Sequence, residues 1–315
     1  MTPTLIDAHT HVGTDLLFYL NGHYPYTQDW PMLVERGTRA GISHFVVFPM
    51  VSHCGLDLSA LREGRISTAP SSVPYQFENL RLMKELERFT EHRHRAIPFW
   101  MLDPSRAPEA QTVALAALKD RFRCFGLKLQ ATIIQSFVSD LLGRGGVLLD
   151  LAEKEDWPLI IHTSVHPEDP WSQVKDILRV AKARPRIRFN LAHSCRFDRE
   201  ALDQVAELPN TWFDCSAHRI HCILAEQDHP AIAAQKHRFS SDYRNPAQVF
   251  ADLAATYPGK LLWGSDAPFE SYIDDAVQLR SSYEAEASLL KAVSPASREA
   301  AAHSNIMKFL GHETL

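Results

Sequence analysis

The sequence lacks any long apolar run, and no stretch approaches the roughly 18 residues that a membrane-spanning helix needs. It also lacks an excess of basic residues: 33 lysines and arginines stand against 38 acids, which gives a net charge of −5. A nucleic-acid binder with a basic stripe is therefore not expected. The five cysteines form an odd-numbered set without a spaced framework, which indicates reduced thiols. No basic segment precedes an apolar one at the start, so we expect no secretory signal and a cytoplasmic location.

Several short catalytic motifs are missing as well. The chain has no Gly-x-Ser-x-Gly elbow, no phosphate-binding Gly-x₄-Gly-Lys loop, no His-Glu-x-x-His pair and no dinucleotide fingerprint after its first strand. What remains is the composition of an ordinary globular protein, 45% hydrophobic and 23% charged.

Short apolar runs alternate with amphipathic stretches along the whole chain, which favours parallel strands joined by helices. One amphipathic stretch carries Val174, Ile177, Leu178 and Ala181 at helical spacing. The alternation predicts a single-domain (β/α)₈ TIM barrel over residues 1–315, with a doubly wound open sheet as the alternative. The eight predicted strands are Leu5–His9, His44–Pro49, Ala96–Leu102, Cys124–Leu129, Leu159–His162, Ile187–His193, Trp212–Cys215 and Leu261–Ser265.

Two long segments follow the carboxyl ends of predicted strands. Gly13–Trp30 and Val51–Tyr75 are rich in glycine, proline, serine and aromatic residues, without regular periodicity. Barrel enzymes build their sites from the loops at this end of the strands, so we interpret both segments as active-site loops.

The first predicted strand runs into Asp7-Ala8-His9-Thr10-His11. Side chains alternate along a strand, so Asp7, His9 and His11 are predicted to share one face. Two imidazoles at this spacing can converge on one metal ion. Alone, His-x-His is a weak motif, because exposed pairs of histidines also produce it.

Three later strands also lead to a potential metal ligand. These ligands are His162, His193 and Asp266, at the ends of the fifth, sixth and eighth predicted strands. Each one alone would be read as a buried histidine or a helix-capping acid. Four strands that deliver such residues to one rim of a barrel favour a joint site.

Together these residues resemble the amidohydrolase superfamily, and more narrowly its amidohydrolase-related branch, which includes aminocarboxymuconate semialdehyde decarboxylase. The resemblance covers essentially the whole chain and is specific to the superfamily, not to a substrate. It is carried by the opening Asp-Ala-His-Thr-His, the strand-terminal His162 and His193, Trp263–Pro268 (Trp-Gly-Ser-Asp-Ala-Pro) and His303-Ser304-Asn305-Ile306.

The resemblance implies one divalent metal, usually zinc with manganese also possible, held by His9, His11, His162 and Asp266. His193 would then act beside it as the acid/base or electrostatic partner, and Asp266 could also accept a proton from the attacking water. Zinc lowers the pKa of a bound water from about 16 toward 7, which supplies a nucleophile at neutral pH.

Lys128, on the fourth predicted strand, leaves two interpretations open. Binuclear members of the superfamily carry a carboxylated lysine at such a position, bridging two metals. An uncarboxylated lysine could instead pair with a substrate carboxylate or with Asp7. We favour one metal over two.

Further candidates follow the sixth and seventh strands. Arg196 could bind a substrate carboxylate, because its planar fork suits bidentate contact, and a solvated surface charge is an equally good reading. His218 could reach substrate from the segment Cys215–Cys222. A small zinc cluster there is less favoured, because its spacing is tighter than that of ordinary structural zinc sites.

The leading hypothesis is therefore metal-dependent hydrolysis of an amide, ester or lactone bond in a small organic acid. The alternative keeps the metal but makes the reaction non-oxidative decarboxylation of an unsaturated or aromatic acid. A barrel that retains the site only for binding or assembly is a third, weaker reading. The expected partner is a small-molecule carboxylate, with a homodimer possible by analogy to similar folds.

Overall fold

The computed structural model describes residues 4–51, 60, 63, 65 and 73–312. Its central feature is a sheet with strand order β2-β1-β3-β4-β5-β6-β7-β8-β9. All neighbours pair in parallel except β2 (Thr27–Gln28), which pairs antiparallel with the end of β1. The parallel strands are β1 (Ile6–Thr14), β3 (His44–Pro49), β4 (Ala96–Met101), β5 (Gly126–Leu129), β6 (Leu159–Ile161), β7 (Phe189–Leu191), β8 (Thr211–Asp214) and β9 (Leu261–Leu262).

Backbone hydrogen bonds between the first and last parallel strands close the sheet into a barrel. The amide of Ala8 donates to the carbonyl of Trp263 at 3.0 Å, and the amide of Asp266 donates to the carbonyl of His9 at 2.9 Å. A parallel bridge also pairs Thr10 with Ala267. The (β/α)₈ TIM barrel predicted from the sequence is confirmed.

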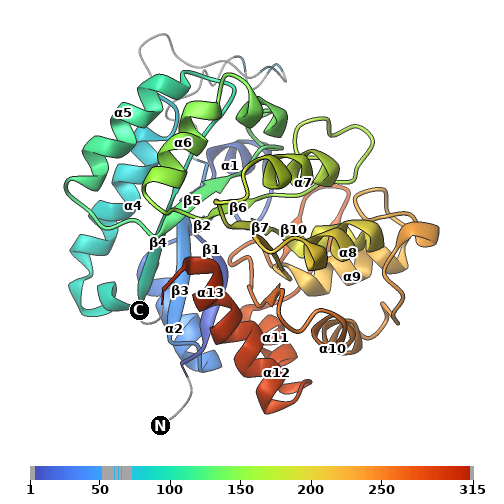
Figure 1. The fold of residues 1–315 in the computed structure, drawn as a ribbon. Helices are drawn as coiled ribbons and strands as arrows, with labels where there is room; N and C mark the ends of the chain where they lie inside the picture. Colours follow the sequence, from blue (N-terminus) through green and yellow to red (C-terminus); the bar gives the residue numbers. More distant parts are fainter. Residues whose placement is uncertain (1–3, 52–59, 61–62, 64, 66–72, 313–315) are drawn as a thin grey trace.

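Helices form the outer layer around these strands (Figure 1). This explains why strands such as β3 and β6 are continuous apolar runs, since both faces of each are buried. The final helices return to the β1 side, where α11 packs on α2. The α-helices are α1 (Leu16–Asn21), α2 (Trp30–Ala40), α4 (Gln76–Arg88), α5 (Pro108–Lys119), α6 (Gly146–Lys154), α7 (Val174–Ala183), α8 (Arg199–Glu207), α9 (His218–Glu226), α10 (Pro246–Thr256), α11 (Tyr283–Ser288), α12 (Pro295–Glu299) and α13 (Asn305–Leu310).

Local sequence signals account for several of these boundaries. The Asn245 side chain caps α10 by accepting from the amide of Gln248, and Ser294 caps α12 in the same way. Each cap is followed by a proline at the first helical position, where the missing N–H costs nothing. The apolar stripe predicted on α7 is buried against the sheet.

Two predictions about the loops at the rim had different outcomes. Gly13–Trp30 was expected to be irregular, which is wrong: it contains the end of β1, helix α1 and strand β2. The side chain of Asp15 caps α1 by accepting from the amide of Phe18. Most of Val51–Tyr75 lies outside the described residues.

A second small sheet also lies at this rim. It is the hairpin β10 (Tyr272–Ile273) and β11 (Gln278–Leu279), which the sequence did not predict. Ile273 pairs with Tyr24 of the β1–β2 connection, so these two rim segments support each other. Within the described part of the chain, no helix is both long and apolar enough to cross a bilayer.

Candidate active site

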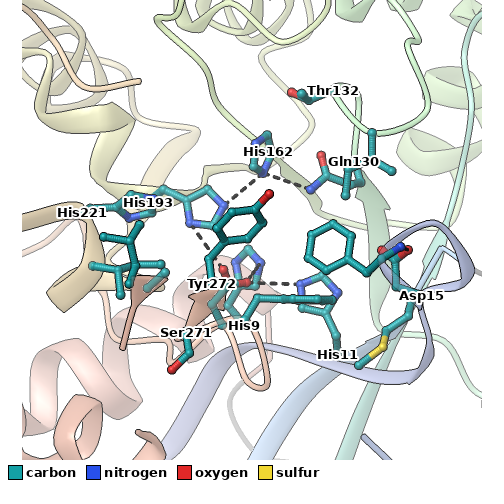
Figure 2. Close-up of a pocket in the computed structure, with 18 of the residues that line it drawn as sticks. His9, His11, Asp15, Gln130, Thr132, His162, His193, His221, Ser271 and Tyr272 are labelled. Carbon is teal, nitrogen blue, oxygen red and sulfur yellow. Dashed lines mark hydrogen bonds and ion pairs between the residues drawn. The ribbon is translucent and has the colours of Figure 1, made fainter. Parts of the chain in front are cut away.

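A cavity of about 310 Å³ opens at the carboxyl ends of the strands. Figure 2 shows that its histidines come from opposite sides of the barrel and point toward one another. The polar residues that line it include His9, His11, Gln130, His162, His193, Arg196, His221 and Asp266. Most of the candidate residues predicted from the sequence therefore line one cavity at this rim.

The carboxylate of Asp266 lies between the two histidines of β1. Its Oδ1 atom is 3.2 Å from the Nε2 atom of His9 and 3.2 Å from the Nε2 atom of His11. Burial lowers the pKa of His11 to about 4, so its ring is neutral at pH 7. Burial alone would raise the pKa of Asp266, but the nearby imidazoles, His193 first and then His9, hold it well below its ordinary value.

An irregularity in β1 separates Asp7 from these two histidines. The register against β3 shifts between Asp7 and Thr10, which breaks the simple alternation of side chains. Asp7 therefore does not share the face of His9 and His11, contrary to the sequence-based prediction. It accepts from the hydroxyl of Tyr283 and the amide of Ser265, both at 2.9 Å, and so holds the β9 end against β1.

Asp214, at the end of β8, orients the ring of His9. Its Oδ2 atom lies 2.9 Å from the Nδ1 atom of His9 and accepts from the side chain of Asn190 at 2.7 Å. Its Oδ1 atom accepts from the amides of His193 and Ser216. Burial would raise the pKa of Asp214, but the charge of His9 and hydrogen bonds from the side chains of His9 and Ser216 lower it below the ordinary range. A carboxylate behind a ligating histidine is the usual support of a metal site.

Lys128 on β5 is fully buried, and its Nζ atom lies 3.1 Å from the Nε2 atom of His9. It also stands over the ring of Phe48, 4.6 Å from the centroid. Burial lowers its pKa to about 8, although Asp214 and Asp266 oppose this shift. For an uncarboxylated Lys128, the predicted pairing with Asp7 is absent, because its contacts are with His9 and Phe48.

A tight left-handed turn after β7 brings two site residues to the cavity. Residues 193–197 all have positive φ, between 50° and 61°. L-residues rarely adopt this conformation in succession, because Cβ approaches the neighbouring carbonyl. With about three residues per turn, positions three apart lie above one another, which places His193 and Arg196 on the same side. Such strain is typical of functional sites.

His162 and His193 form a contact pair across the β6–β7 boundary. The Nε2 atom of His193 lies 3.0 Å from the Nδ1 atom of His162, which also lies 3.2 Å from the amide nitrogen of Gln130 (Figure 2). The other ring nitrogen of His162, Nε2, accepts from Arg196 at 2.9 Å. The Nδ1 atom of His193 lies 2.9 Å from the hydroxyl of Ser216 and 4.0 Å from Asp266.

Helix α9 presents a different histidine to the cavity from the one predicted. His221 lines the cavity and accepts from Arg196, whereas His218 is directed to the carbonyl of Pro246 at 2.9 Å. His218 is also 3.5 Å from the thiol of Cys222. Of the two histidines of α9, therefore, only His221 lines the cavity.

The sequence reasoning missed Asp214, Gln130 and His221. Asp214 could have been found, because it lies at the end of the seventh predicted strand, where the same rule that found His162 applies. Gln130 follows β5, and its Oε1 atom is buried without a hydrogen-bond partner among the described residues. An acceptor of that kind in a cavity wall is available to a substrate.

The fold is that of the barrel enzymes, which build their sites at the carboxyl ends of the strands, and the convergent imidazoles and carboxylates of this chain lie at that end. The profile of the amidohydrolase family matches residues 77–312, so this chain belongs to that family. No curated protein matches the chain.

Solved structures with the same fold cover nearly the whole chain. One is a putative 2-pyrone-4,6-dicarboxylic acid hydrolase from Pseudomonas putida, at 16% identity and a TM-score of 0.60, covering 100% of both chains. An amidohydrolase from Burkholderia multivorans has 16% identity and a TM-score of 0.61, covering 98% of this chain and 99% of its own. A 2,6-dihydroxybenzoate decarboxylase has 13% identity and a TM-score of 0.56, covering 98% of both. At these identities the likeness shows the fold alone.

Proposed function

We propose that this chain is a metal-dependent hydrolase that cleaves an amide, ester or lactone bond in a small organic acid, with water as the nucleophile. The observation that carries the proposal is a convergence of donor atoms. His9, His193 and Asp266 each place one nitrogen or oxygen within 4.8 Å of the others, and all three are buried. Membership of the amidohydrolase family, which indicates an enzyme, supports this reading.

The donor set fits one divalent cation. Imidazole nitrogens and a carboxylate oxygen are the ligands of catalytic Zn²⁺ sites, and Mn²⁺ accepts the same donors. We propose His9, His11, His162 and Asp266 as ligands, with His193 beside them. The rival assignment makes His193 a ligand, because it belongs to the convergent group while both ring nitrogens of His162 already have partners.

The support of the site by Asp214 strengthens the fit to a metal. Because Asp214 faces the Nδ1 atom of His9 at 2.9 Å, the Nε2 atom is the one directed toward Asp266. Lys128 also touches this Nε2 atom, and a lysine with a lowered pKa can give up its proton more readily than an exposed one. A second metal held through a carboxylated Lys128 remains the less favoured arrangement.

The protein's own residues can divide the chemistry of hydrolysis between them. A bound divalent cation would lower the pKa of water and polarise the substrate carbonyl. Asp266 stays ionised and can accept the proton of the attacking water. Burial, and then the charge of Arg196, hold the pKa of His193 well below its ordinary value, so its resting ring is neutral and can hydrogen-bond to the substrate. His193 faces Asp266, so it can take over the proton that Asp266 accepts from water and deliver that proton to the leaving group.

A second candidate function is non-oxidative decarboxylation of an unsaturated or aromatic acid. The observation that favours it is the aromatic edge of the cavity, where Phe18 contacts both Phe269 and Tyr272 edge to face. Such a wall suits a flat ring. One solved structure of the same fold is a decarboxylase complexed with a dihydroxybenzoate.

The decisive experiment combines metal analysis with product analysis. Purified protein would be assayed for bound metal, then tested on esters, lactones, amides and free acids with aromatic bodies, measuring acid release and carbon dioxide release separately. Acid release without carbon dioxide supports hydrolysis, and the reverse result supports decarboxylation. Protein that holds almost no metal and is not activated by added zinc or manganese would contradict both.

A further inference from the structure

Arg196 is a buried cation in the cavity wall that has no carboxylate partner within the described part of the chain. Arg196 is only 9% exposed. Its Nε atom donates to the carbonyl of Thr163 at 2.7 Å, and its two terminal nitrogens donate to His162 and His221. These partners are a carbonyl oxygen and two ring nitrogens, and none of them is a carboxylate. Among the described residues, no acid lies within ion-pair distance of Arg196.

This arrangement leaves the guanidinium incompletely satisfied. Arginine has five N–H groups, and the described contacts of Arg196 use three of them, one on each nitrogen. One N–H therefore remains on each terminal nitrogen, and a carboxylate can accept hydrogen bonds from these N–H groups. Burying a charge is costly unless it is paired, so an anion that enters the cavity would complete the site.

The backbone is built to hold this side chain in place. The left-handed turn over residues 193–197 sets Arg196 three positions after His193. The bond from Arg196 to the carbonyl of Thr163, next to His162, then fixes the guanidinium between β6 and α9. Two imidazoles, His162 and His193, separate it from Asp266.

The remaining wall, as far as the described residues form it, is mostly apolar and contains no second arginine or lysine. Arg196 is the one arginine or lysine among the cavity-lining residues that the structure describes. The apolar lining comes from both sides of the mouth and includes Ile133, Ile220, Leu224, Phe269, Val277 and Leu279. A ring or an unsaturated chain would fill this space, because such a body gains free energy from leaving water.

We propose that Arg196 binds a single carboxylate of the substrate, which makes the substrate a monocarboxylic acid with an apolar, ring-sized body. The bond to be cleaved lies at the opposite end of that body, beside Asp266. The inference rests on the proposed function for the location of the reaction. The expected substrate differs from the pyrone dicarboxylic acid for which structural neighbours are named, because a second carboxylate would meet the apolar wall of this cavity.

Equilibrium binding tests the subsite without requiring turnover. Calorimetry would compare benzoate, neutral benzamide and the dicarboxylate isophthalate on the full-length protein and on Arg196→Gln, Arg196→Lys and Arg199→Gln. Arg199 is the matched control, since it lies three residues away in an exposed pair with Asp203. We expect Arg196→Gln to weaken benzoate by about ten- to a hundredfold, as loss of a charge-assisted contact does, with benzamide changed little.

The other variants and the dicarboxylate each have an expected result. Arg196→Lys should retain part of the affinity, Arg199→Gln should match the wild type, and isophthalate should bind more weakly than benzoate. Benzoate binding that is unchanged in Arg196→Gln, or absent from the wild type at about 10 mM, a weak-binding concentration, overturns the proposal. If Arg196→Gln does not fold, a crystal of the wild type with 3-bromobenzoate decides the matter by the position of the carboxylate.

The same measurements separate this inference from the proposed function. Benzoate that binds through Arg196 in protein without hydrolytic activity would refute the hydrolase proposal and leave the subsite intact. Hydrolysis of a carboxylate-bearing ester whose kcat/KM is unchanged in Arg196→Gln would refute the subsite and leave the hydrolase proposal intact. Binding that disappears with a chelator but persists in Arg196→Gln would show that the carboxylate goes to the metal, which also overturns the subsite.

Discussion

The two sides of the cavity differ in the groups that surround their buried charges. The β1 side, formed by His9, His11, Lys128, Asp214 and Asp266, places two carboxylates among imidazoles and an ammonium group. The opposite side, formed by His162, His193, Arg196 and His221, surrounds one guanidinium with neutral rings. Both sides are buried, so the difference lies in the partners. The first side is suited to a cation and the second to an anion.

The largest effect is expected from replacing Asp266, the carboxylate at the centre of the β1 side. Asp266→Asn removes both a ligand and the proton acceptor, so turnover should fall by about 10³-fold or more. Metal content and steady-state rates would be measured together. Asp150→Asn is the control, because this acid is 63% exposed in a surface pair with Arg184. Activity within a few fold of wild type in Asp266→Asn would contradict the role given to it.

The pair of histidines on the opposite side gives the next test. His162→Ala should lower bound metal, whereas His193→Ala should keep the metal and lose turnover by about 10²- to 10³-fold, as loss of an acid/base does. His237→Ala, an exposed histidine on the outside of the barrel, should change neither. If His193→Ala also empties the site, the rival ligand assignment is correct.

Glu286, a buried acid outside the cavity, makes the stability of the folded protein depend on pH. Glu286 is fully buried, and burial raises its pKa to about 8, only partly offset by hydrogen bonds from Ser281 and Arg219. The folded state therefore holds a proton that the unfolded chain releases near pH 4.5. Its contribution to stability is undiminished below pH 4.5 and falls as the pH rises toward 8.

Replacing this acid should remove that dependence. Glu286→Gln keeps an acceptor but cannot ionise, so the protein should gain roughly 3 kcal/mol of unfolding free energy at pH 7 relative to wild type, with little change at pH 4.5. Denaturant titrations at several pH values would measure it. Glu284→Gln, an exposed neighbour on the same helix, should leave the slope as it is. An equal shift at every pH would contradict the assignment of the titrating group.

The smallest effect is expected from changing Asp214, which orients the ring of His9. Asp214→Asn keeps the size of the side chain but removes the charge behind the imidazole, so metal affinity should fall by about 10- to 100-fold. Competition with a chelating dye would measure it, with Asp150→Asn again as the control. Unchanged affinity would mean that Asp214 serves only the backbone of residues His193 and Ser216.

Most ends of the predicted parallel strands lie within three residues of the strand ends in the structure. These strands could be predicted because continuous apolar runs between amphipathic helices are a local signal. The sequence also predicted which strands end in His162, His193 and Asp266. It did not predict the shift in β1 that turns Asp7 away, nor the short rim elements β2 and β10–β11. These features depend on pairing with distant segments, such as Tyr24 with Ile273.

What the sequence by itself determined is the kind of chemistry available: imidazoles and a carboxylate at the carboxyl ends of strands, since strand position and residue type are both local properties. Only the tertiary structure decided which of these groups touch. The contacts of Asp214 with His9 and of Arg196 with His162 and His221 join residues far apart in the chain. Charge state and orientation depend on such contacts through space and on burial, so they are fixed only when the barrel closes.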